Sequence, residues 1–80
     1  MNNRQLRILY YFFSNATPCK SGDIARELKL SSRTIRDTIK EMQPACQENG
    51  FSIHSRRNYG FEIQIEDEQL YQAFGDRRLD

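Results

Sequence analysis

The sequence lacks the signals of a secreted, disulfide-bonded or membrane-spanning protein. Its two cysteines, Cys19 and Cys46, are not spaced as a metal pair and are too few for a disulfide framework. No stretch approaches the ~18 apolar residues that span a membrane. The first residues, MNNRQLR, contain no apolar run ending in a small-residue cleavage site. We therefore expect a cytoplasmic, single-domain chain with two free thiols, no membrane partner and no bound metal.

Residues that could perform catalysis are also scarce. The single histidine, His54, lies opposite the apolar face of a predicted strand, and no serine has a histidine and an acid in a catalytic pattern nearby. Lys20, beside Cys19, could lower the pKa of that thiol modestly, but a lone cysteine in a connector is far more often inert, and we expect it to be inert here. Cys46 continues an apolar helical stripe. We expect no enzyme activity, no catalytic residue and no cofactor.

A net charge of only +1 conceals an uneven distribution of charge along the chain. Residues 1–60 contain ten Lys or Arg and five Asp or Glu, whereas residues 61–80 contain two Arg and six acids. A basic body followed by an acidic tail suits a polyanionic partner on one side of the molecule. A solvated charged surface is the alternative interpretation of the same totals.

The first predicted helix covers residues 3–14, which contain no Gly or Pro. Leu6, Leu9, Tyr10 and Phe13 are spaced i, i+3, i+4 and i+7, so they form one helical stripe. Neighbouring apolar residues widen this stripe and predict burial on more than one side. Residues 15–20 form a connector that contains a proline.

The segment from Ser21 to Met42 has the pattern of two short helices joined by a tight turn. We predict Ser21 as the N-cap of the first helix, residues 29–31 as the turn, and Ser31 or Ser32 as the cap of the second helix. The apolar positions of the second helix are Ile35, Ile39, Met42 and Cys46. Two helices at a steep angle around such a turn can place the second one in the DNA major groove.

Pro44 interrupts this second helix. It lacks an amide hydrogen, and its ring clashes with the carbonyl of Lys40. The helix is therefore expected to kink near Gln43, or to end there with Pro44 opening a further turn. Gly50 is the predicted stop.

After Gly50 the apolar period changes to two. Alternation in residues 51–54 and 61–65 predicts a β-hairpin, with SRRNYG at its tip and with Asn58 and Gly60 able to adopt positive φ. Residues 66–68 suit the first turn of a last helix, which is expected to end at Gly75. Its predicted apolar residues are Leu70, Tyr71 and Phe74.

These elements predict an α+β winged helix-turn-helix, which is a three-helix bundle with a C-terminal β-hairpin wing and a short final helix. We assign residues 1–66 to a winged helix DNA-binding domain. Residues 67–80 are assigned to a short acidic helix that begins a linker to further C-terminal domains.

The helical period identifies which side chains of the second helix could contact DNA. Within the predicted recognition helix, residues 32–43, the outward residues are Ser32, Arg33, Arg36, Asp37 and Lys40, with Thr34 at the margin. Because Arg can bond bidentately to guanine, we expect Arg33 and Arg36 to face base edges, with Ser32 and Thr34 beside them and Lys40 on the backbone. Asp37 would repel phosphate. It is therefore expected either to orient Arg33 or Arg36 or to accept a bond from a cytosine amino group.

The hairpin tip, residues 56–60, supplies the second set of candidate contacts. Arg56, Arg57 and Asn58 could follow a phosphate chain or enter a minor groove, which adds affinity more than sequence information. The alternatives are a basic tip that keeps the hairpin soluble and, for the whole domain, a winged helix that binds proteins and not DNA. An RNA-binding role is disfavoured because the hairpin has few aromatics to stack on unpaired bases.

The run LSSRTIRDTIKEM followed by GFSIHSRRNYGFEIQI resembles the N-terminal winged helix of bacterial transcription regulators of the phosphotransferase-system-regulated activator and Mga type. DeoR-like repressors share the helix pattern. The resemblance covers roughly residues 4–66 and implies binding to double-stranded promoter DNA by a regulator whose sensing domains lie C-terminal to this one. We also expect a homodimer of the full-length protein. The chain departs from the family at Thr38, where an acid is common, and at Asn58, where the wing often has Gly.

Overall fold

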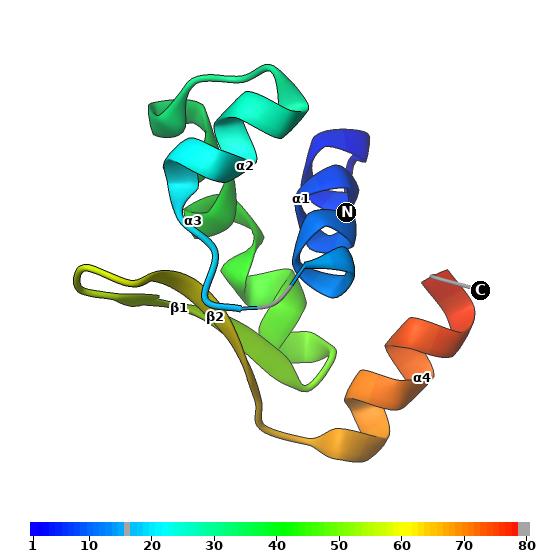
Figure 1. Ribbon diagram of the computed structural model, residues 1–80. Coiled ribbons are helices and arrows are strands. Elements are labelled where there is room, and N and C mark those ends of the chain that lie inside the picture. Colours follow the sequence, from blue (N-terminus) through cyan, green and yellow to red (C-terminus); the bar gives the residue numbers. More distant parts are fainter. Residues whose placement is uncertain (16, 79–80) are drawn as a thin grey trace.

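The computed structural model describes residues 1–15 and 17–78, and it has the predicted α+β order of elements (Figure 1). Its elements are α1 (Asn3–Ser14), α2 (Ser21–Leu28), α3 (Ser32–Glu48), β1 (Phe51–Arg56), β2 (Gly60–Ile65) and α4 (Glu68–Arg78). Helices α1 to α3 pack together on one side of the antiparallel β1–β2 hairpin, and the hairpin tip and α4 lie at opposite ends of the molecule (Figure 1).

Helix α1 begins with a capping box, because the side chains of Asn2 and Gln5 each accept a bond from the backbone amide of the other. The residues that it buries are Ile8, Leu9 and Phe12. Tyr10, predicted in the apolar stripe, is 45% exposed. Successive helical residues are rotated by about 100°, so a face centred on Ile8, Leu9 and Phe12 turns Tyr10 away from the core.

Helix α2 has a different cap from the one that the sequence predicts. Lys20, not Ser21, occupies the N-cap position, and it makes no side-chain capping bond. The Lys20 carbonyl accepts from the amides of Asp23 and Ile24 at 3.0 and 3.1 Å. The backbone before it is fixed by a two-bond bridge between Cys19 and Phe61 of β2. The helix therefore starts where this bridge ends, which the local sequence does not reveal.

Helix α3 continues through Pro44 to Glu48, so of the two predicted alternatives the one in which the helix ends at Gln43 is wrong. Lys40 and Pro44 are both exposed, and water can bond to a carbonyl that loses its helical partner on that face. Tertiary contacts hold the helix on both sides of the proline. Cys46 is fully buried, and the Gln43 side chain exchanges two hydrogen bonds with the backbone of Ile53 in β1. The helix therefore continues without the hydrogen bond that Pro44 cannot donate to the Lys40 carbonyl.

The hairpin forms as predicted, and its strands extend into the predicted tip, since β1 continues to Arg56 and β2 begins at Gly60. Phe51 pairs with Ile65 and Arg56 pairs with Gly60, and both Asn58 (φ 69°) and Gly60 (φ 109°) have positive φ. A Cβ atom on Gly60 would lie 2.4 Å from the carbonyl oxygen of Cys19. Only glycine permits this approach, which brings the connector before α2 against the base of the wing.

Helix α4 packs on the core through aromatic rings. The Phe51 ring centroid lies 5.3 Å from that of Tyr71 and 5.5 Å from that of Phe74. The helix runs through Gly75 to Arg78, so the predicted end at Gly75 is wrong. Gly75 does not have positive φ and therefore continues the helix like any other residue.

The domain boundary after residue 66 and the linker role of residues 67–80 stay predictions, and Asp80 is outside the described residues.

The core joins all the helices to the hairpin. Its buried apolar residues are Ile8, Leu9, Phe12, Cys19, Ile24, Ala25, Ile35, Ile39, Met42, Cys46, Phe51, Ile53 and Phe74. The four apolar positions predicted for α3 are all among them. Thr38, one of the positions at which the sequence departs from the family it resembles, is only 2% exposed and belongs to the core side of α3.

Candidate nucleic-acid interface

The outer face of α3 carries the charged residues that its sequence period predicts. Ile35, Thr38, Ile39 and Met42 are buried, so the charged side chains between them face outward. The exposed charged residues of this face are Arg33, Arg36, Asp37, Lys40 and Glu41. Because α3 is anchored by its buried stripe, this charged surface has a fixed orientation relative to the hairpin.

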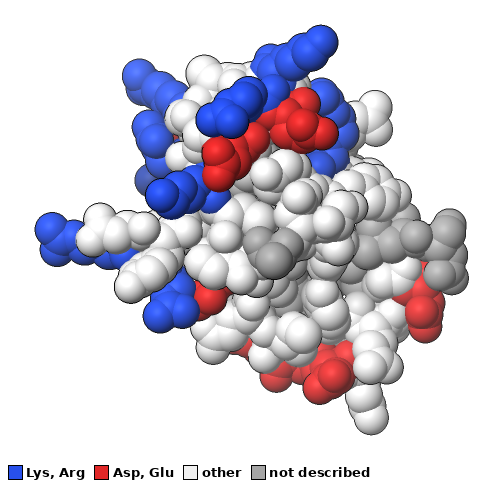
Figure 2. Space-filling view, in the orientation of Figure 1, with Lys and Arg blue, Asp and Glu red and all other residues white. Residues whose placement is uncertain are grey.

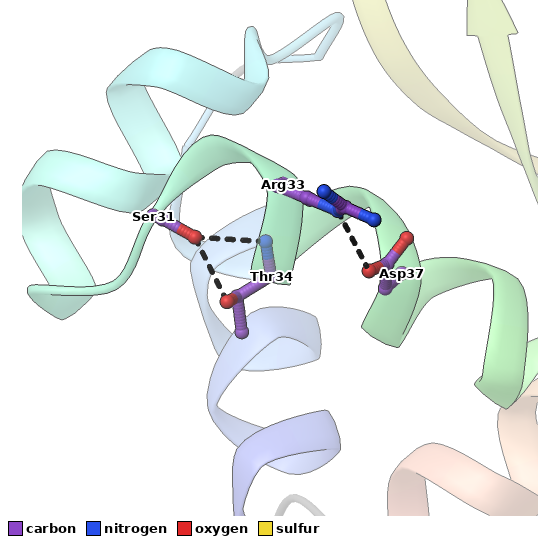
Figure 3. A network of polar contacts seen from close by, with 4 residues as sticks. All are labelled: Ser31, Arg33, Thr34 and Asp37. Carbon is purple, nitrogen blue, oxygen red and sulfur yellow. Dashed lines mark hydrogen bonds and ion pairs between the residues drawn. The ribbon is translucent and has the colours of Figure 1, made fainter.

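The N-terminus of α3 is organised by Ser31. Its Oγ accepts from the Thr34 amide at 3.0 Å and donates to Thr34 Oγ1 at 2.8 Å (Figure 3). The Thr34 hydroxyl is therefore part of the helix cap, although one lone pair remains. Ser32 and Thr34 are half-buried and stand at the start of the helix. Both predicted contact residues thus lie closer to the turn than to the middle of the charged face.

Asp37 forms an ion pair with Arg33. The sequence alone left open whether its partner is Arg33 or Arg36. Arg33 Nε lies 3.8 Å from Asp37 Oδ2, one helical turn along α3 (Figure 3). The two side chains are 86% and 64% exposed. Among the described residues, Arg36 takes part in no ion pair. Of the two arginines that Asp37 could orient, it therefore contacts Arg33.

A groove separates α3 from the wing, and we call it the wing groove. It is lined by Lys20, Ser21, Gly22, Asp23, Arg36, Ser55, Arg56, Arg57, Asn58, Gly60 and Phe61. Arg36 stands on one side, and the three predicted wing residues stand on the other. The structure thus brings together four of the nine predicted site residues around one concave surface.

A second groove runs between α3 and β1, and it also contains Arg36. Its other predicted site residues are Asp37 and Lys40. Its floor includes Gln43, whose amide ties α3 to Ile53. Of the predicted site residues, Ser32, Arg33 and Thr34 line neither groove. Arg36 is therefore the residue that connects the helix surface with the wing surface.

The two arginines of the wing have different surroundings. Arg56 Nη1 lies 3.4 Å from Glu62 Oε2, and its Cζ lies 5.5 Å from the ring centroid of Tyr59. Arg57 forms no ion pair within the described part of the chain and is exposed. Arg56 thus has part of its charge balanced by its own hairpin, whereas Arg57 presents an unbalanced charge at the tip.

Sequence reasoning missed the side of the wing groove that precedes and begins α2. Lys20, Ser21 and Gly22 line it, and the Cys19–Phe61 bridge places them there. A backbone bridge between residues about forty positions apart leaves no local periodicity, so the only available signal was a lysine beside a predicted helix start. Lys20 adds positive charge to the same groove as Arg36 and Arg57.

Positive and negative side chains occupy different regions of the surface. In Figure 2, Lys and Arg gather over the part formed by α1 to α3 and at the hairpin tip, with some acidic side chains among them. The lower edge and the end that carries α4 show mainly Asp and Glu (Figure 2). On the face shown in Figure 2, the uneven distribution of charge along the chain thus corresponds to a partial separation in space.

Both cysteine thiols have raised pKa values. Burial, followed by the nearby Asp23 carboxylate, raises the pKa of Cys19, so the alternative in which Lys20 lowers it is wrong. Burial raises the pKa of Cys46 to about 11. The described residues contain no group of three side chains that could hold a metal ion, and no helix among them is long and apolar enough to cross a membrane.

Comparison with known proteins gives a family match and a relative. The model of the HTH domain family matches residues 4–62 of the chain. The probable licABCH operon regulator of Bacillus subtilis (strain 168) is 31% identical over 73 residues, which cover 91% of this chain and 11% of the relative. The chain therefore spans about a ninth of the length of that relative. No solved structure matches the chain.

Proposed function

We propose that this chain, which belongs to the HTH domain family, is the promoter-recognition domain of a bacterial transcription regulator. The Bacillus subtilis relative is named a probable operon regulator, and the alignment with it covers 91% of this chain. DNA binding in transcription regulation follows from the family. The proposal adds which surface reads DNA, by which residues, and that the reading depends on sequence.

In this proposal, residues 32–43 of α3 enter the major groove. Arg33 and Arg36 are exposed and carry planar forks that can bond to O6 and N7 of guanine. Lys40 stands one turn after Arg36 and contacts the backbone as a point charge. Ser32 and Thr34, beside the helix start, approach phosphate oxygens together with the free amides of the first turn. The buried Thr38 takes no part in this contact.

The wing, residues 56–60, contacts the backbone or the minor groove beside the segment that α3 reads. Arg57 makes the main ionic contact, because its charge is not balanced within the hairpin. Arg56, held by Glu62 and Tyr59, forms the rigid side of the tip, and Asn58 supplies the turn. These contacts fix the position of the domain and raise its affinity for any duplex.

The observation that supports this proposal most strongly is the position of Arg36. It lines the wing groove together with Arg56 and Arg57, and it lines the second groove together with Lys40. One strand of a duplex seated against these grooves would meet helix and wing cations at the same time. A protein-binding winged helix has no need for such convergence of positive charge.

Selection of bound sequences from a random duplex pool tests the proposal. The chain is expected to enrich a short motif, and NMR titration with that duplex is expected to shift amides near residues 32–40 and 56–60. A repeated half-site in the enriched duplexes would report the homodimer expected of the full-length protein. The absence of enrichment, or shifts confined to residues 67–78, would instead favour the protein-contact alternative.

A further inference from the structure

Asp37 carries a negative charge on the surface that is proposed to approach phosphates. Residues 32–43 contain two acids, Asp37 and Glu41, and of these Asp37 lines the groove between α3 and β1. A carboxylate there weakens the attraction between the helix and any duplex. Its position therefore needs a separate physical reason.

Helix stability does not supply that reason. Arg33 and Asp37 are both largely exposed, and exposed pairs one turn apart contribute little. The order of the pair is also the less favourable one, since an acid preceding a base stabilises a helix better than the reverse. Asp37 is in the second turn of α3, where the helix dipole gives a carboxylate little support.

The geometry of the pair leaves the reading edge of Arg33 available. Asp37 Oδ2 approaches Nε, the nitrogen nearest the side-chain stem, at 3.8 Å (Figure 3). This distance exceeds a hydrogen bond, so attraction between the charges, and not a fixed bond, biases the guanidinium orientation. The two terminal nitrogens remain able to form a bidentate contact with guanine.

We propose that Asp37 is a positioning residue for base reading, which orients the Arg33 guanidinium through Nε. Its negative charge lowers the affinity for every duplex, and the orientation of Arg33 raises the discrimination at one base pair. This inference rests on the proposed function, because it assumes that α3 reads bases. The residue acts through Arg33 and does not itself contact the base. Its removal should therefore alter the same base-pair preference as the removal of Arg33.

The test compares motifs selected from one random duplex pool by four proteins: the native chain, Arg33→Ala, Asp37→Asn and Asp37→Glu. The position whose guanine preference disappears with Arg33→Ala identifies the base pair that Arg33 reads. Asp37→Asn is expected to weaken guanine preference at that same position by roughly 3–10-fold. This is a part of the ~5–150-fold discrimination against the wrong base that a full bidentate contact supplies. Asp37→Glu, which keeps the charge, should restore it.

Two further measurements separate positioning from other roles. Binding of Asp37→Asn to a duplex without the motif should become tighter at low salt, because one repulsive charge is removed. Its melting temperature should stay at the native value. In a double-mutant cycle, Asp37→Asn in the Arg33→Ala background should cause no further loss of preference at that position.

Three results would overturn the inference. Asp37→Asn could leave the motif unchanged, which would make Asp37 only a repulsive charge. It could alter a different base pair, independently of Arg33, which would mean direct acceptance from cytosine. Native-like discrimination by the double variant would also contradict it. A failure of the native chain to enrich any motif is a separate outcome, because that result contradicts the proposed function itself.

Discussion

Arg36 differs from its neighbours because it belongs to both grooves and has no intramolecular ion pair among the described residues. We predict that Arg36→Ala relaxes preference at one base pair and loses about 1–3 kcal/mol of specific binding, with little effect on other duplexes. Fluorescence anisotropy with the selected duplex and its single-base variants measures this loss.

Arg36→Lys is the matched control for that prediction. It keeps the charge but lacks the planar fork, so it should retain most non-specific affinity and still lose the base preference. If Arg36→Ala weakened every duplex by the same factor, Arg36 would be a phosphate contact and the assignment to a base edge would be wrong.

The two wing arginines are expected to respond differently to substitution. Arg57→Ala removes an unbalanced positive charge, so it should weaken binding to all duplexes alike and reduce the log–log salt slope by about 0.9. Arg57→Lys, which keeps a point charge, should bind nearly as the native chain does. A change in base preference with Arg57→Ala would show that the wing reads sequence, against this prediction.

At the scale of elements, the junction between the connector and the wing depends on Gly60. Its φ is 109°, and an added Cβ atom would lie 2.4 Å from the Cys19 carbonyl oxygen, so there is no room for a side chain. We predict that Gly60→Ala destabilises the fold by roughly 1–3 kcal/mol or more, measured by urea unfolding. It should also weaken DNA binding, since Lys20 and Arg57 would no longer line one groove.

Gly75→Ala provides the control for Gly60. A Cβ atom at Gly75 meets nothing within 4 Å, and α4 continues through this position. Alanine should stabilise the helix there by about 0.5–1 kcal/mol. Equal effects of the two substitutions would contradict the role given to the Cys19–Phe61 bridge.

Helix α3 contains a second element-scale test at Pro44. Proline in a helix interior costs about 3 kcal/mol relative to alanine, and its restriction of the unfolded chain offsets roughly 0.4–1 kcal/mol of that. Pro44→Ala is therefore expected to stabilise the chain by about 2 kcal/mol in urea unfolding at an unchanged m-value. Glu41→Ala, at an exposed position of the same helix, should change stability by less than about 0.5 kcal/mol. A destabilising Pro44→Ala would mean that the native helix needs the proline geometry.

Element type was predictable from the sequence where apolar periodicity is strong. The stripe of Ile35, Ile39, Met42 and Cys46 and the antiparallel hairpin both appear in the structure, but the predicted alternation is incomplete because Ser52 is buried and Ile65 is 45% exposed. Element ends were less predictable, since they depend on distant contacts. The start of α2 follows from the Cys19–Phe61 bridge, and the continuation of α3 past Pro44 accompanies the Gln43–Ile53 clamp.

In the candidate site too, features set by local periodicity were predictable and features set by distant contacts were not. The helical period was sufficient to predict which α3 side chains face outward. It could not show that the Arg33–Asp37 ion pair forms, although residues four positions apart lie on one helix face and the adjacent Arg36 and Asp37 do not. Nor could it show that Lys20 joins the wing groove, because that juxtaposition results from backbone pairing over a long stretch of chain.

At the scale of the whole molecule, the separation of charge determines how the domain meets a polyanion. On the face shown in Figure 2, Lys and Arg gather over α1 to α3 and at the hairpin tip, whereas the described side chains near α4 are mainly acidic. A duplex would therefore be attracted to the grooved side and repelled from the opposite end. Each phosphate contact releases condensed counterions, so the number of contacts can be counted from the effect of salt.

The affinity of the 80-residue chain for its selected duplex, measured at increasing salt concentration, tests this picture most directly. With about four or five phosphates neutralised, the plot of log affinity against log salt should have a slope near −4. Affinity would then fall roughly 250-fold between about 50 and 200 mM salt. Absent binding by the folded chain, or binding that does not change with salt, would contradict DNA recognition by the basic grooves.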